Sequence, residues 1–569
     1  MRGPGLRGRR YVVLLVVLCG FGVVLFRLVN LQVLQADALA TRADRQHQKT
    51  VALEGARGTI LDRQGKILAM NVEVPSIFGV PASVVNPQKT ARSLSAILRV
   101  PADELERKLH QDRNFVWLAR KVDPEQGRQL EALSLKGIGV VMEGRRFYPK
   151  GPLLAHVLGF SGMDGEGLEG VEHRYDVDLH GERQQMVLQR DAKGRTIFSK
   201  GSVEESPAPG HSLTLTIDEV IQYIAERELD DAVSRSRAKS GTMIVLDPET
   251  GALLALAVSP RFDPNAVSSV PSDRRRNIAV TDAYEPGSTM KAVMAAAAIE
   301  ERVMGPTTMV FAENGRMTVA NTVIHDHEKL GWVSFAQVIQ KSSNIGAAKA
   351  GMALGEQRLY RYLKAFGFGQ RTDIDLPGEG FGLVKSPKEW GRRSIASISI
   401  GQEIGVTPIQ MVSAIGAIAN GGQLMKPYLV SEVRDSNGRL LSQVQPQVRR
   451  RIVSPETARS VTRILEGVVT DGTGSKAAIP GFRVAGKTGT AQKVDPRTKT
   501  YSDSKLVSSF VGYVPAEHPK LAMLVVIDEP QGDHTGGVVA APVFSHAGEQ
   551  ILSYLGISPH ERLTVGMAR

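Results

Sequence analysis

The stretch YEPGSTMKAVMAAAAI, residues 284–299, places a serine directly before a long apolar helix. Ser288 opens this helix, and Lys291 follows three residues later, on the same helical face. Backbone N–H groups at a helix start stabilise an anion. Partial burial beside the helix would lower the pKa of Lys291 and give a neutral amine able to take the Ser288 proton. The stretch therefore predicts a serine nucleophile with an amine base.

The Ser-x-x-Lys pattern alone carries little information, because it begins at three serines: Ser236, Ser288 and Ser502. Ser236 lies in a polar stretch at the end of a predicted helix, and Ser502 lies in a charged loop. Ser288 alone is followed by a strongly apolar helix. This context selects Ser288 as the candidate nucleophile.

A second motif, Ser342-Ser343-Asn344, stands later in the chain. The Ser342 hydroxyl can relay a proton to a leaving amine, and the Asn344 carboxamide can hold a peptide group. Serine and asparagine are also ordinary helix N-caps, and on its own the motif is more typical of a helix start.

A third motif, Lys487-Thr488-Gly489-Thr490, occurs once and is typical of a strand with small residues. Gly489 lets a substrate backbone lie close. Lys487, Thr488 and Thr490 present a cation and hydroxyls to a carboxylate. The N–H groups of Thr490 and Ser288 can form an oxyanion hole. The alternative is a glycine-containing edge strand without chemistry.

Length and composition indicate a folded chain of several domains. At 569 residues the chain is too long for one ordinary core, and 42% hydrophobic and 23% charged residues exclude a mainly disordered chain. The net charge of +11 comes from 70 basic residues spread among 59 acidic ones. This pattern argues against nucleic acid and favours weak attraction to an anionic surface. The one cysteine, Cys19, excludes an intramolecular disulfide.

The N-terminal sequence predicts a single transmembrane anchor over residues 11–31. Residues 1–10 carry four arginines and form a cytoplasmic tail, and residues 11–26 carry no charge. Arg27 can extend its charge to the headgroups, which lets the helix reach the length of a membrane span. A cleaved signal peptide is disfavoured, because the small residues of 36–40 lie well beyond the apolar run. The remaining chain is then outside the cytoplasmic membrane.

Residues 32–205 form a predicted non-catalytic module, and residues 206–560 a second domain. Residues 57–65 and the apolar residues after them predict a hairpin, in which arginines and Asp62 form buried ion pairs. Residues 202–212 are the most linker-like stretch in the chain.

Two further hairpins are expected in the second domain, one over residues 242–256 and one over residues 506–527. Strands at both ends and helices between them predict an α+β fold, in which one antiparallel sheet is covered by helices.

The three ordered motifs are similar to those of serine β-lactamases and penicillin-binding proteins. With the anchor and the Arg-Gly-x-Ile-x-Asp-Arg pattern at 57–63, residues 11–555 resemble a class B penicillin-binding protein. Asp528-Glu529-Pro530, Gly536-Gly537 and residues 541–544 are most similar to the division-specific, septal transpeptidases. The resemblance implies an elongated dimerisation or pedestal module followed by a transpeptidase domain with a serine β-lactamase-like fold.

The resemblance also implies that the D-Ala-D-Ala end of a peptidoglycan stem peptide acylates Ser288. An amine of a neighbouring stem peptide then resolves the ester. Its catalytic residues are Ser288, Lys291, Ser342 and Asn344, and its substrate and oxyanion residues are Lys487, Thr488, Gly489 and Thr490. It implies acylation by β-lactams, glycan from a lipid-linked precursor, a membrane glycosyltransferase and other divisome partners, and no cofactor.

Two segments depart from the division-type pattern. His534-Thr535 stands where aromatic residues often precede the Gly-Gly pair, and residues 402–408 replace a tyrosine-rich segment of some relatives. Both segments are expected near the acyl pocket. Division and elongation roles, and the β-lactam preference, therefore stay open.

Other functions have weaker support in the sequence. A β-lactamase needs an additional base, and no glutamate motif for it stands between 344 and 487. A D,D-carboxypeptidase uses the same residues with water as acceptor. A penicilloyl-binding sensor or division scaffold would need no intact motifs. The stretch His325-Asp326-His327 is a lone His-x-His of the kind that is usually incidental, so no metal is expected.

Overall fold

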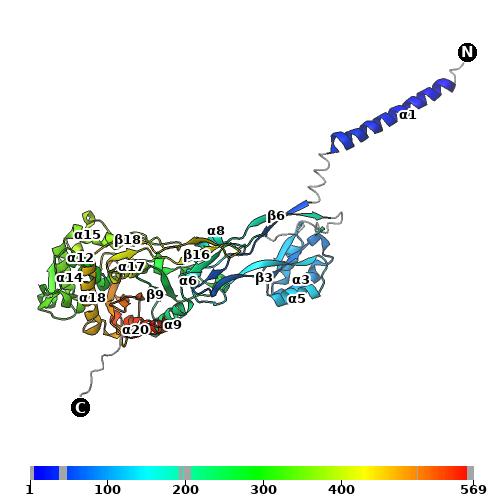
Figure 1. The fold of residues 1–569 in the computed structure, drawn as a ribbon. Coiled ribbons are helices and arrows are strands. Elements are labelled where there is room, and N and C mark those ends of the chain that lie inside the picture. The colour runs from blue at the N-terminus through cyan, green and yellow to red at the C-terminus, as the bar shows by residue number, and fades with distance from the viewer. Residues whose placement is uncertain are drawn as a thin grey trace. The chain divides into compact units, whose positions relative to one another are not determined.

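The computed structural model describes residues 6–36, 48–113, 115–190, 196–197, 207–495 and 497–559. They form two compact units (Figure 1). The first unit comprises Met1–Ala56 and Gly181–Pro209, and the second comprises Arg57–His180 and Gly210–Arg569.

The first unit contains the expected apolar helix. Helix α1 (Leu6–Val29) continues into a π-helical turn, η1 (Asn30–Leu34). The segment Gly8–Leu34 has 27 residues and a mean hydropathy of 2.8, so it is long and apolar enough to cross a membrane. The described part of the unit also contains a three-stranded antiparallel sheet of β1 (Gln48–Glu54), β6 (Arg183–Arg190) and β7 (Thr196–Ile197).

The hairpin predicted near residue 57 is confirmed in the second unit. Strands β2 (Ile60–Leu61) and β3 (Ile67–Gly79) pair antiparallel. The prediction of an ion pair at Asp62 is wrong: its carboxylate accepts the backbone N–H groups of Gln64 and Lys66, both at 2.8 Å, and of Glu219 at 3.2 Å. Asp62 is therefore a turn cap, because the nearest donors in a tight turn are backbone groups.

The first arginine of the same pattern, Arg57, does enter a buried ion pair. Arg57 Nε lies 2.6 Å from Oε2 of Glu172, and Arg146 Nε lies 2.6 Å from the other oxygen, Oε1. Glu172 is 0% exposed, and Tyr148 also donates to it at 3.3 Å. One carboxylate thus holds two guanidinium groups from distant segments in a low-dielectric interior.

A seven-stranded sheet joins segments from both sides of residue 205. Strand β2 pairs in parallel with β8 (Ser212–Leu215), and β8 pairs with β16 (Val430–Arg434). The other strands are β4 (Val116–Ala119), β5 (Ile138–Phe147) and β17 (Leu440–Gln443). Residues 202–206 of the expected linker lie outside the described residues, so the boundary at 205 stays a prediction.

Three helices pack against β3 and β4 around a small core of their own: α3 (Pro87–Leu98), α4 (Ala102–Leu109) and α5 (Pro124–Ala132). The second unit also contains several short helices: α6 (Ala155–Leu158), α7 (Gly170–Arg174), α8 (Asp176–Leu179), α10 (Ser272–Arg275), α11 (Ile278–Thr281) and α19 (Gly536–Val539).

A five-stranded antiparallel sheet forms the centre of the second domain, as predicted. Its spatial order is β10-β9-β21-β20-β19, so strands from distant parts of the sequence lie side by side. The strands are β9 (Ser240–Leu246), β10 (Leu253–Ser259), β19 (Ala485–Val494), β20 (Tyr501–Val514) and β21 (Leu521–Asp528).

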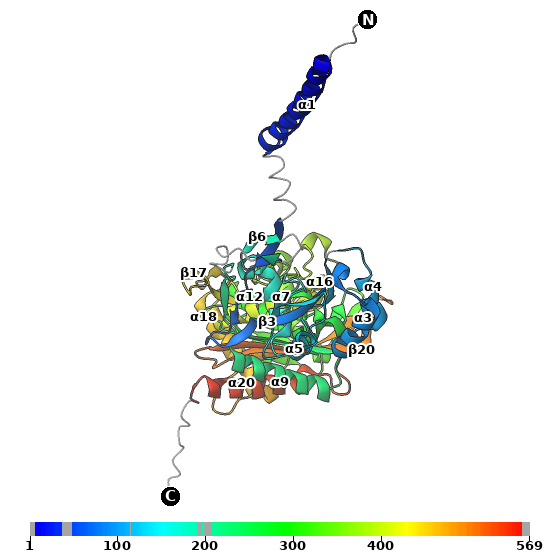
Figure 2. The ribbon, with the colours of Figure 1, turned by 90° about the vertical axis from the view of Figure 1, so that its right-hand side faces the viewer.

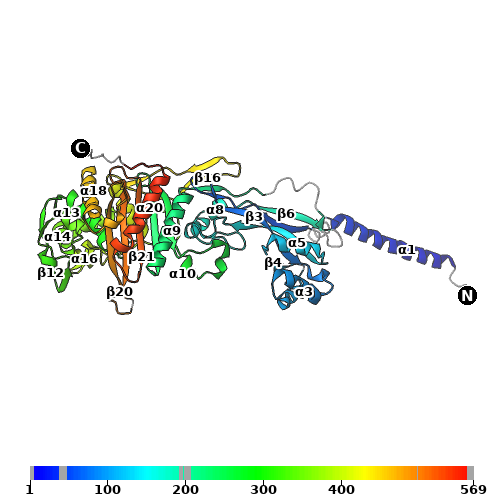
Figure 3. The same ribbon diagram turned by 90° about the horizontal axis from the view of Figure 1, so that it is seen from below.

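Helices cover both faces of this sheet, because its strands are apolar on both faces. Along β9, Met243 and Val245 belong to one core cluster and Ile244 and Leu246 to the other. Helices α9 (Glu219–Arg235) and α20 (Ala541–Tyr554) lie side by side on the first face (Figures 2 and 3). Helices α12 (Met290–Glu300) and α17 (Pro408–Ala419) pack on the opposite side.

Helix α12 lies at the centre of the helical part. Residues 290–298 are all buried, and its run of alanines lets neighbouring helices approach closely. Those neighbours are α13 (Phe335–Gln340), α14 (Asn344–Leu354), α15 (Glu356–Ala365), α16 (Ser394–Ser399) and α18 (Pro455–Thr470). The domain also contains small two-stranded antiparallel sheets. Strand β11 (Met309–Phe311) pairs with β14 (Trp332–Ser334), β12 (Arg316–Val319) with β13 (Thr322–His325), and β15 (Gln423–Met425) with β18 (Val448–Arg451).

The buried carboxylate predicts a large stability effect. Glu172→Gln leaves the Arg146 guanidinium buried without a counter-charge and Arg57 with Asp176 alone, so we expect a loss of about 3 kcal/mol in the free energy of unfolding. Denaturant unfolding of the full chain in detergent measures this. The control Glu456→Gln breaks an exposed ion pair with Arg459 and should cost less than about 1 kcal/mol. Equal losses in the two variants would contradict the assigned role of Glu172.

Candidate active site

Ser288 lies in a tight turn that leads directly into α12. The turn, η4 (Gly287–Thr289), is a single 3-10 turn, and α12 begins at Met290. Gly287 has a φ of +53° and donates its N–H to Gly401 O at 3.0 Å. The serine therefore stands at the start of the helix, as the sequence predicts.

The turn packs directly on strand β19. A Cβ added at Gly489 would lie 2.9 Å from Thr289 Cγ2 and 3.0 Å from Pro286 O. A Cβ added at Gly287 would lie 2.9 Å from Thr490 O. The missing side chain at Gly489 thus lets the turn before α12 pack on the strand. That Gly489 also makes room for a substrate backbone stays a prediction. The two glycines thus bring Ser288 and the third motif together.

Lys291 links the first motif to the second. It is 0% exposed, and its Nζ donates to Ser342 O at 2.6 Å, to Ser342 Oγ at 3.2 Å and to Asn344 Oδ1 at 2.8 Å. The predicted partners Lys291, Ser342 and Asn344 therefore share one hydrogen-bond network.

Lys487 approaches the same hydroxyl from β19. It is also 0% exposed, and its Nζ donates to Ser342 Oγ at 3.0 Å. Further contacts go to Thr488 O at 3.2 Å and Thr488 Oγ1 at 3.3 Å. Two buried amines thus meet at the hydroxyl of Ser342.

Burial makes these amines unusually easy to deprotonate. Burial lowers the pKa of Lys291 to about 7, and the negative charge of Asp326 opposes this shift. Burial, followed by the charge of Lys291, lowers the pKa of Lys487 well below its ordinary value. A neutral amine at Lys291 is therefore accessible near neutral pH, which is what a general base requires.

The hydroxyl groups of both threonines in the third motif already form hydrogen bonds within the protein. Thr488 Oγ1 lies 2.7 Å from Thr473 Oγ1, and Thr490 Oγ1 accepts the N–H of Gly536 at 3.1 Å. A hydroxyl that accepts still has its own proton to donate. Strand β19 is an edge strand of the five-stranded sheet, so its outer edge offers backbone groups to an extended peptide.

The second motif caps a helix, as the sequence allowed, and also contacts the buried Lys291. Ser343 is the N-cap of α14, and its Oγ accepts the N–H of Gly346 at 2.9 Å. Ser342 has a φ of +58° and, with Asn344, contacts Lys291. The helix start therefore aims the two flanking residues at the buried amine.

Asp326 is the residue that sequence reasoning missed. Its carboxylate accepts from Ser343 Oγ at 2.6 Å, from Asn344 N at 2.6 Å and from Ile345 N at 3.0 Å, and the neighbouring His325 O accepts from the Asn344 amide at 2.9 Å. The His325-Asp326-His327 stretch fixes the second motif in place. Among the described residues, no group of three or more His, Cys, Asp or Glu side chains is arranged to hold a metal ion.

Comparison with known proteins decides the family. A model of the penicillin binding protein transpeptidase domain matches residues 241–548, and a model of the penicillin-binding protein dimerisation domain matches residues 52–215. The chain is a class B penicillin-binding protein. The resemblance inferred from the three motifs is thereby confirmed, and the α+β fold agrees with it.

Three relatives align with this penicillin-binding protein over nearly its whole length. Stage V sporulation protein D of Bacillus subtilis is 36% identical, over 95% of this chain and 85% of the relative. The probable peptidoglycan D,D-transpeptidase PenA of Neisseria meningitidis is 34% identical, over 99% and 95%. Peptidoglycan D,D-transpeptidase FtsI of Escherichia coli is 33% identical, over 97% and 92%.

Solved structures give the same result. A peptidoglycan synthetase from Bifidobacterium adolescentis superposes with a TM-score of 0.72 at 26% identity, covering 90% of this chain and 98% of its own. Penicillin binding protein 3 from Mycobacterium tuberculosis, in complex with aztreonam, gives a TM-score of 0.70 at 27% identity with the same coverage.

The lowered pKa of Lys291 predicts a pH dependence of acylation. The neutral amine is lost as the pH falls through about 7, so we expect the acylation rate constant with penicillin to fall about tenfold per pH unit below that value and to level off above it. A series of rate measurements from about pH 5.5 to 8.5 tests this. A rate that stays level below neutral pH would contradict Lys291 as the base.

The position of Asp326 predicts a slower enzyme without it. Asp326→Ala removes three accepted hydrogen bonds from the loop of the second motif, so we expect acylation by penicillin to slow about 100-fold. Asp326→Asn keeps one acceptor and loses the charge that raises the pKa of Lys291, so its acid limb should move to lower pH. Glu328→Ala, an exposed change on the same loop, is the control and should match the wild type. A wild-type rate of acylation in the Asp326→Ala variant would refute the role of Asp326 in fixing the second motif.

Proposed function

We propose that this protein is a peptidoglycan D,D-transpeptidase that cross-links stem peptides through an acyl-enzyme on Ser288. The observation that carries the proposal is the convergence of the Lys291 and Lys487 amines on Ser342 Oγ, beside the turn that holds Ser288. The names of PenA and FtsI, peptidoglycan D,D-transpeptidases, support the substrate class.

In the first half-reaction, Ser288 Oγ attacks the carbonyl of the penultimate D-Ala while Lys291 takes its proton. The carbonyl oxygen becomes an oxyanion that the N–H groups of Ser288 and Thr490 stabilise. When the intermediate collapses, Ser342 passes a proton to the departing D-Ala amine, and a Ser288 ester remains. Asn344 orients the peptide group of the donor.

The substrate carboxylate sets the charge of Lys487. An anion beside the third motif favours the protonated form of this lysine and raises its pKa. When the two lysines hold one proton between them, Lys487 is the protonated lysine that faces the carboxylate. Lys291 then stays neutral and acts as the base. Thr488 and Thr490 add hydroxyl donors, and Gly489 keeps β19 close to the turn.

In the second half-reaction, the amine of a neighbouring stem peptide attacks the ester. Its proton returns through the same lysine, the new amide forms, and Ser288 Oγ leaves with a proton. A β-lactam carbonyl reacts with Ser288 in the first step, and its ester stays bound. The aztreonam complex of the mycobacterial penicillin binding protein 3 supports this part of the proposal.

The location and the working partners belong to the same proposal. Residues 11–31 anchor the chain in the cytoplasmic membrane with residues 1–10 in the cytoplasm, so that residues 206–560 meet the wall outside it. Residues 32–205 act as the non-catalytic dimerisation or pedestal module. The similarity to FtsI supports septal synthesis with a membrane glycosyltransferase and other divisome proteins.

A fluorescent penicillin tests the nucleophile. Ser288→Ala should lose covalent labelling completely, because no other group in the site forms the ester. Ser236→Ala and Ser502→Ala alter the two other Ser-x-x-Lys patterns and should label like the wild type. Labelling that survives in Ser288→Ala would overturn the proposal.

Release of D-Ala separates the transpeptidase from a carboxypeptidase. With a pentapeptide donor and an added amine acceptor, we expect cross-linked product at the expense of hydrolysis. Hydrolysis that ignores the acceptor would indicate a D,D-carboxypeptidase. Penicillin labelling without any release of D-Ala would indicate a penicilloyl-binding sensor.

A further inference from the structure

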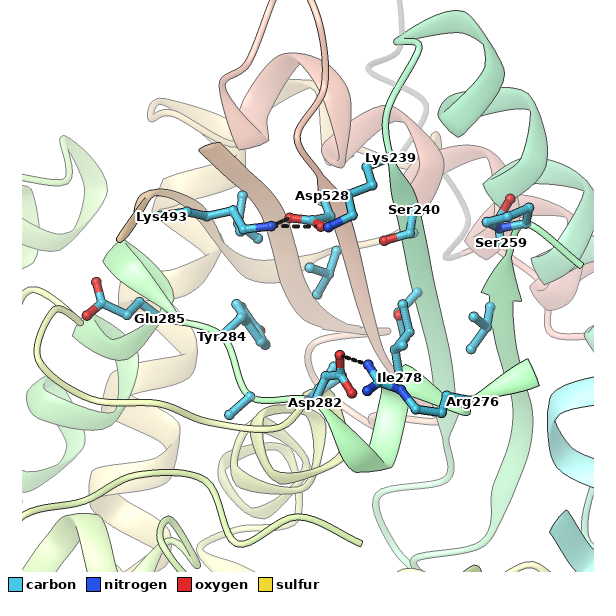
Figure 4. Close-up of a pocket in the computed structure, with 18 of the residues that line it drawn as sticks. Lys239, Ser240, Ser259, Arg276, Ile278, Asp282, Tyr284, Glu285, Lys493 and Asp528 are labelled. Carbon is cyan, nitrogen blue, oxygen red and sulfur yellow. Dashed lines mark hydrogen bonds and ion pairs between the residues drawn. The ribbon is translucent and has the colours of Figure 1, made fainter. Parts of the chain in front are cut away.

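The segment that leads to Ser288 has a cavity on one side. This cavity has a volume of about 720 Å³ and lies against the face of the five-stranded sheet that α12 and α17 also cover (Figure 4). Ser240 and Val526 line it from the sheet, and Ile278, Asp282 and Tyr284 line it from the opposite wall. The residues of the three motifs do not line it. Packing therefore holds this segment incompletely on the cavity side.

The opposite side of the segment is held by the loop of residues 401–406. Tyr284 and Val406 exchange two backbone hydrogen bonds, both of 2.9 Å. Gly287 donates to Gly401 at 3.0 Å, and a Cβ added at Gly401 would lie 2.0 Å from Gly287 O. The loop is thus in direct contact with the turn that carries the nucleophile.

Glu285 adds the side-chain part of this attachment. Its Oε1 accepts the N–H of Glu403 at 3.1 Å and the hydroxyl of Tyr501 at 3.1 Å. Glu285 and Asp282 both line the cavity. In Figure 4 the Glu285 carboxylate points away from its centre, whereas Asp282 lies beside Arg276. One carboxylate oxygen, three residues before Ser288, thus bonds to both the loop and strand β20.

The loop is itself fixed to the helical part. Glu403 has a φ of +58°, and its side chain lies 3.1 Å from Arg393 Nε and 2.7 Å from Ser394 Oγ, at the start of α16. Helix α16 packs against α14, which begins at Asn344. A chain of contacts therefore runs from Glu285 to the helix of the second motif.

We propose that Glu285 is a positioning residue for Ser288: its carboxylate holds the nucleophile turn against the 401–406 loop and Tyr501. The inference rests on the proposed role of Ser288 as the nucleophile. Both bonds are accepted by one oxygen, so an amide oxygen reproduces them. Burial also raises the pKa of Glu285 to about 7, with the Tyr501 and Glu403 bonds opposing the rise. A neutral glutamine is therefore a close substitute.

The test measures acylation by penicillin in the full chain in detergent, with its binding step and its covalent step resolved. Glu285→Ala should slow the covalent step about tenfold or more and leave non-covalent binding unchanged. Glu285→Gln should stay within about threefold of the wild type. Asp282→Asn is the matched control, because it breaks the neighbouring ion pair with Arg276 without touching the loop, and it should acylate normally.

Three results would overturn the proposal: Glu285→Ala at the wild-type rate, Glu285→Gln as slow as Glu285→Ala, or an equal loss in Asp282→Asn. If Glu285→Ala does not fold, Tyr501→Phe decides, since it removes one donor only and should slow the covalent step about threefold. An unchanged rate there also refutes the inference. Failure of the proposed function is distinct, because the wild type would then not be labelled at Ser288.

Discussion

Two lysine side chains buried against one hydroxyl are the constraint on which the rest of the site depends. Ammonium groups this close repel each other, and burying either costs several kcal/mol. The molecule relieves this cost by favouring loss of a proton from Lys291 and Lys487. The same burial that is unfavourable for a charged lysine therefore produces the neutral base that Ser288 needs. Ser342 Oγ, which contacts both amines, is the natural place for the proton to pass.

The fold supplies this arrangement from three distant segments. The sheet order places β19, late in the sequence, at an open edge, and the alanine-rich α12 lets the helices around it pack closely. Gly489 and Gly287 remove the last steric barrier between the strand and the nucleophile turn. Catalytic geometry is thus a consequence of close packing between backbone elements, with Asp326 fixing the loop of the second motif.

Sequence reasoning found what local pattern encodes. Ser288 at a helix start, the hairpins and the antiparallel sheet all follow from apolar periodicity and turn residues over short ranges. It missed Asp326, because no local pattern tells which loop will face Asn344. It assigned Asp62 an ion pair, although the turn offers nearer backbone donors. It did not foresee that Gly489 also lets the chain's own nucleophile turn pack on β19. Each miss concerns a contact between segments far apart in sequence.

The most direct test of the account is peptide mapping by mass spectrometry after treatment of the full chain with penicillin. We expect one penicilloyl adduct, on the peptide that contains Ser288. An adduct on the peptide of Ser236 or Ser502, or no covalent adduct in folded protein, would contradict it. The two other Ser-x-x-Lys patterns of the same chain make this comparison internal, since all three serines meet the reagent under identical conditions.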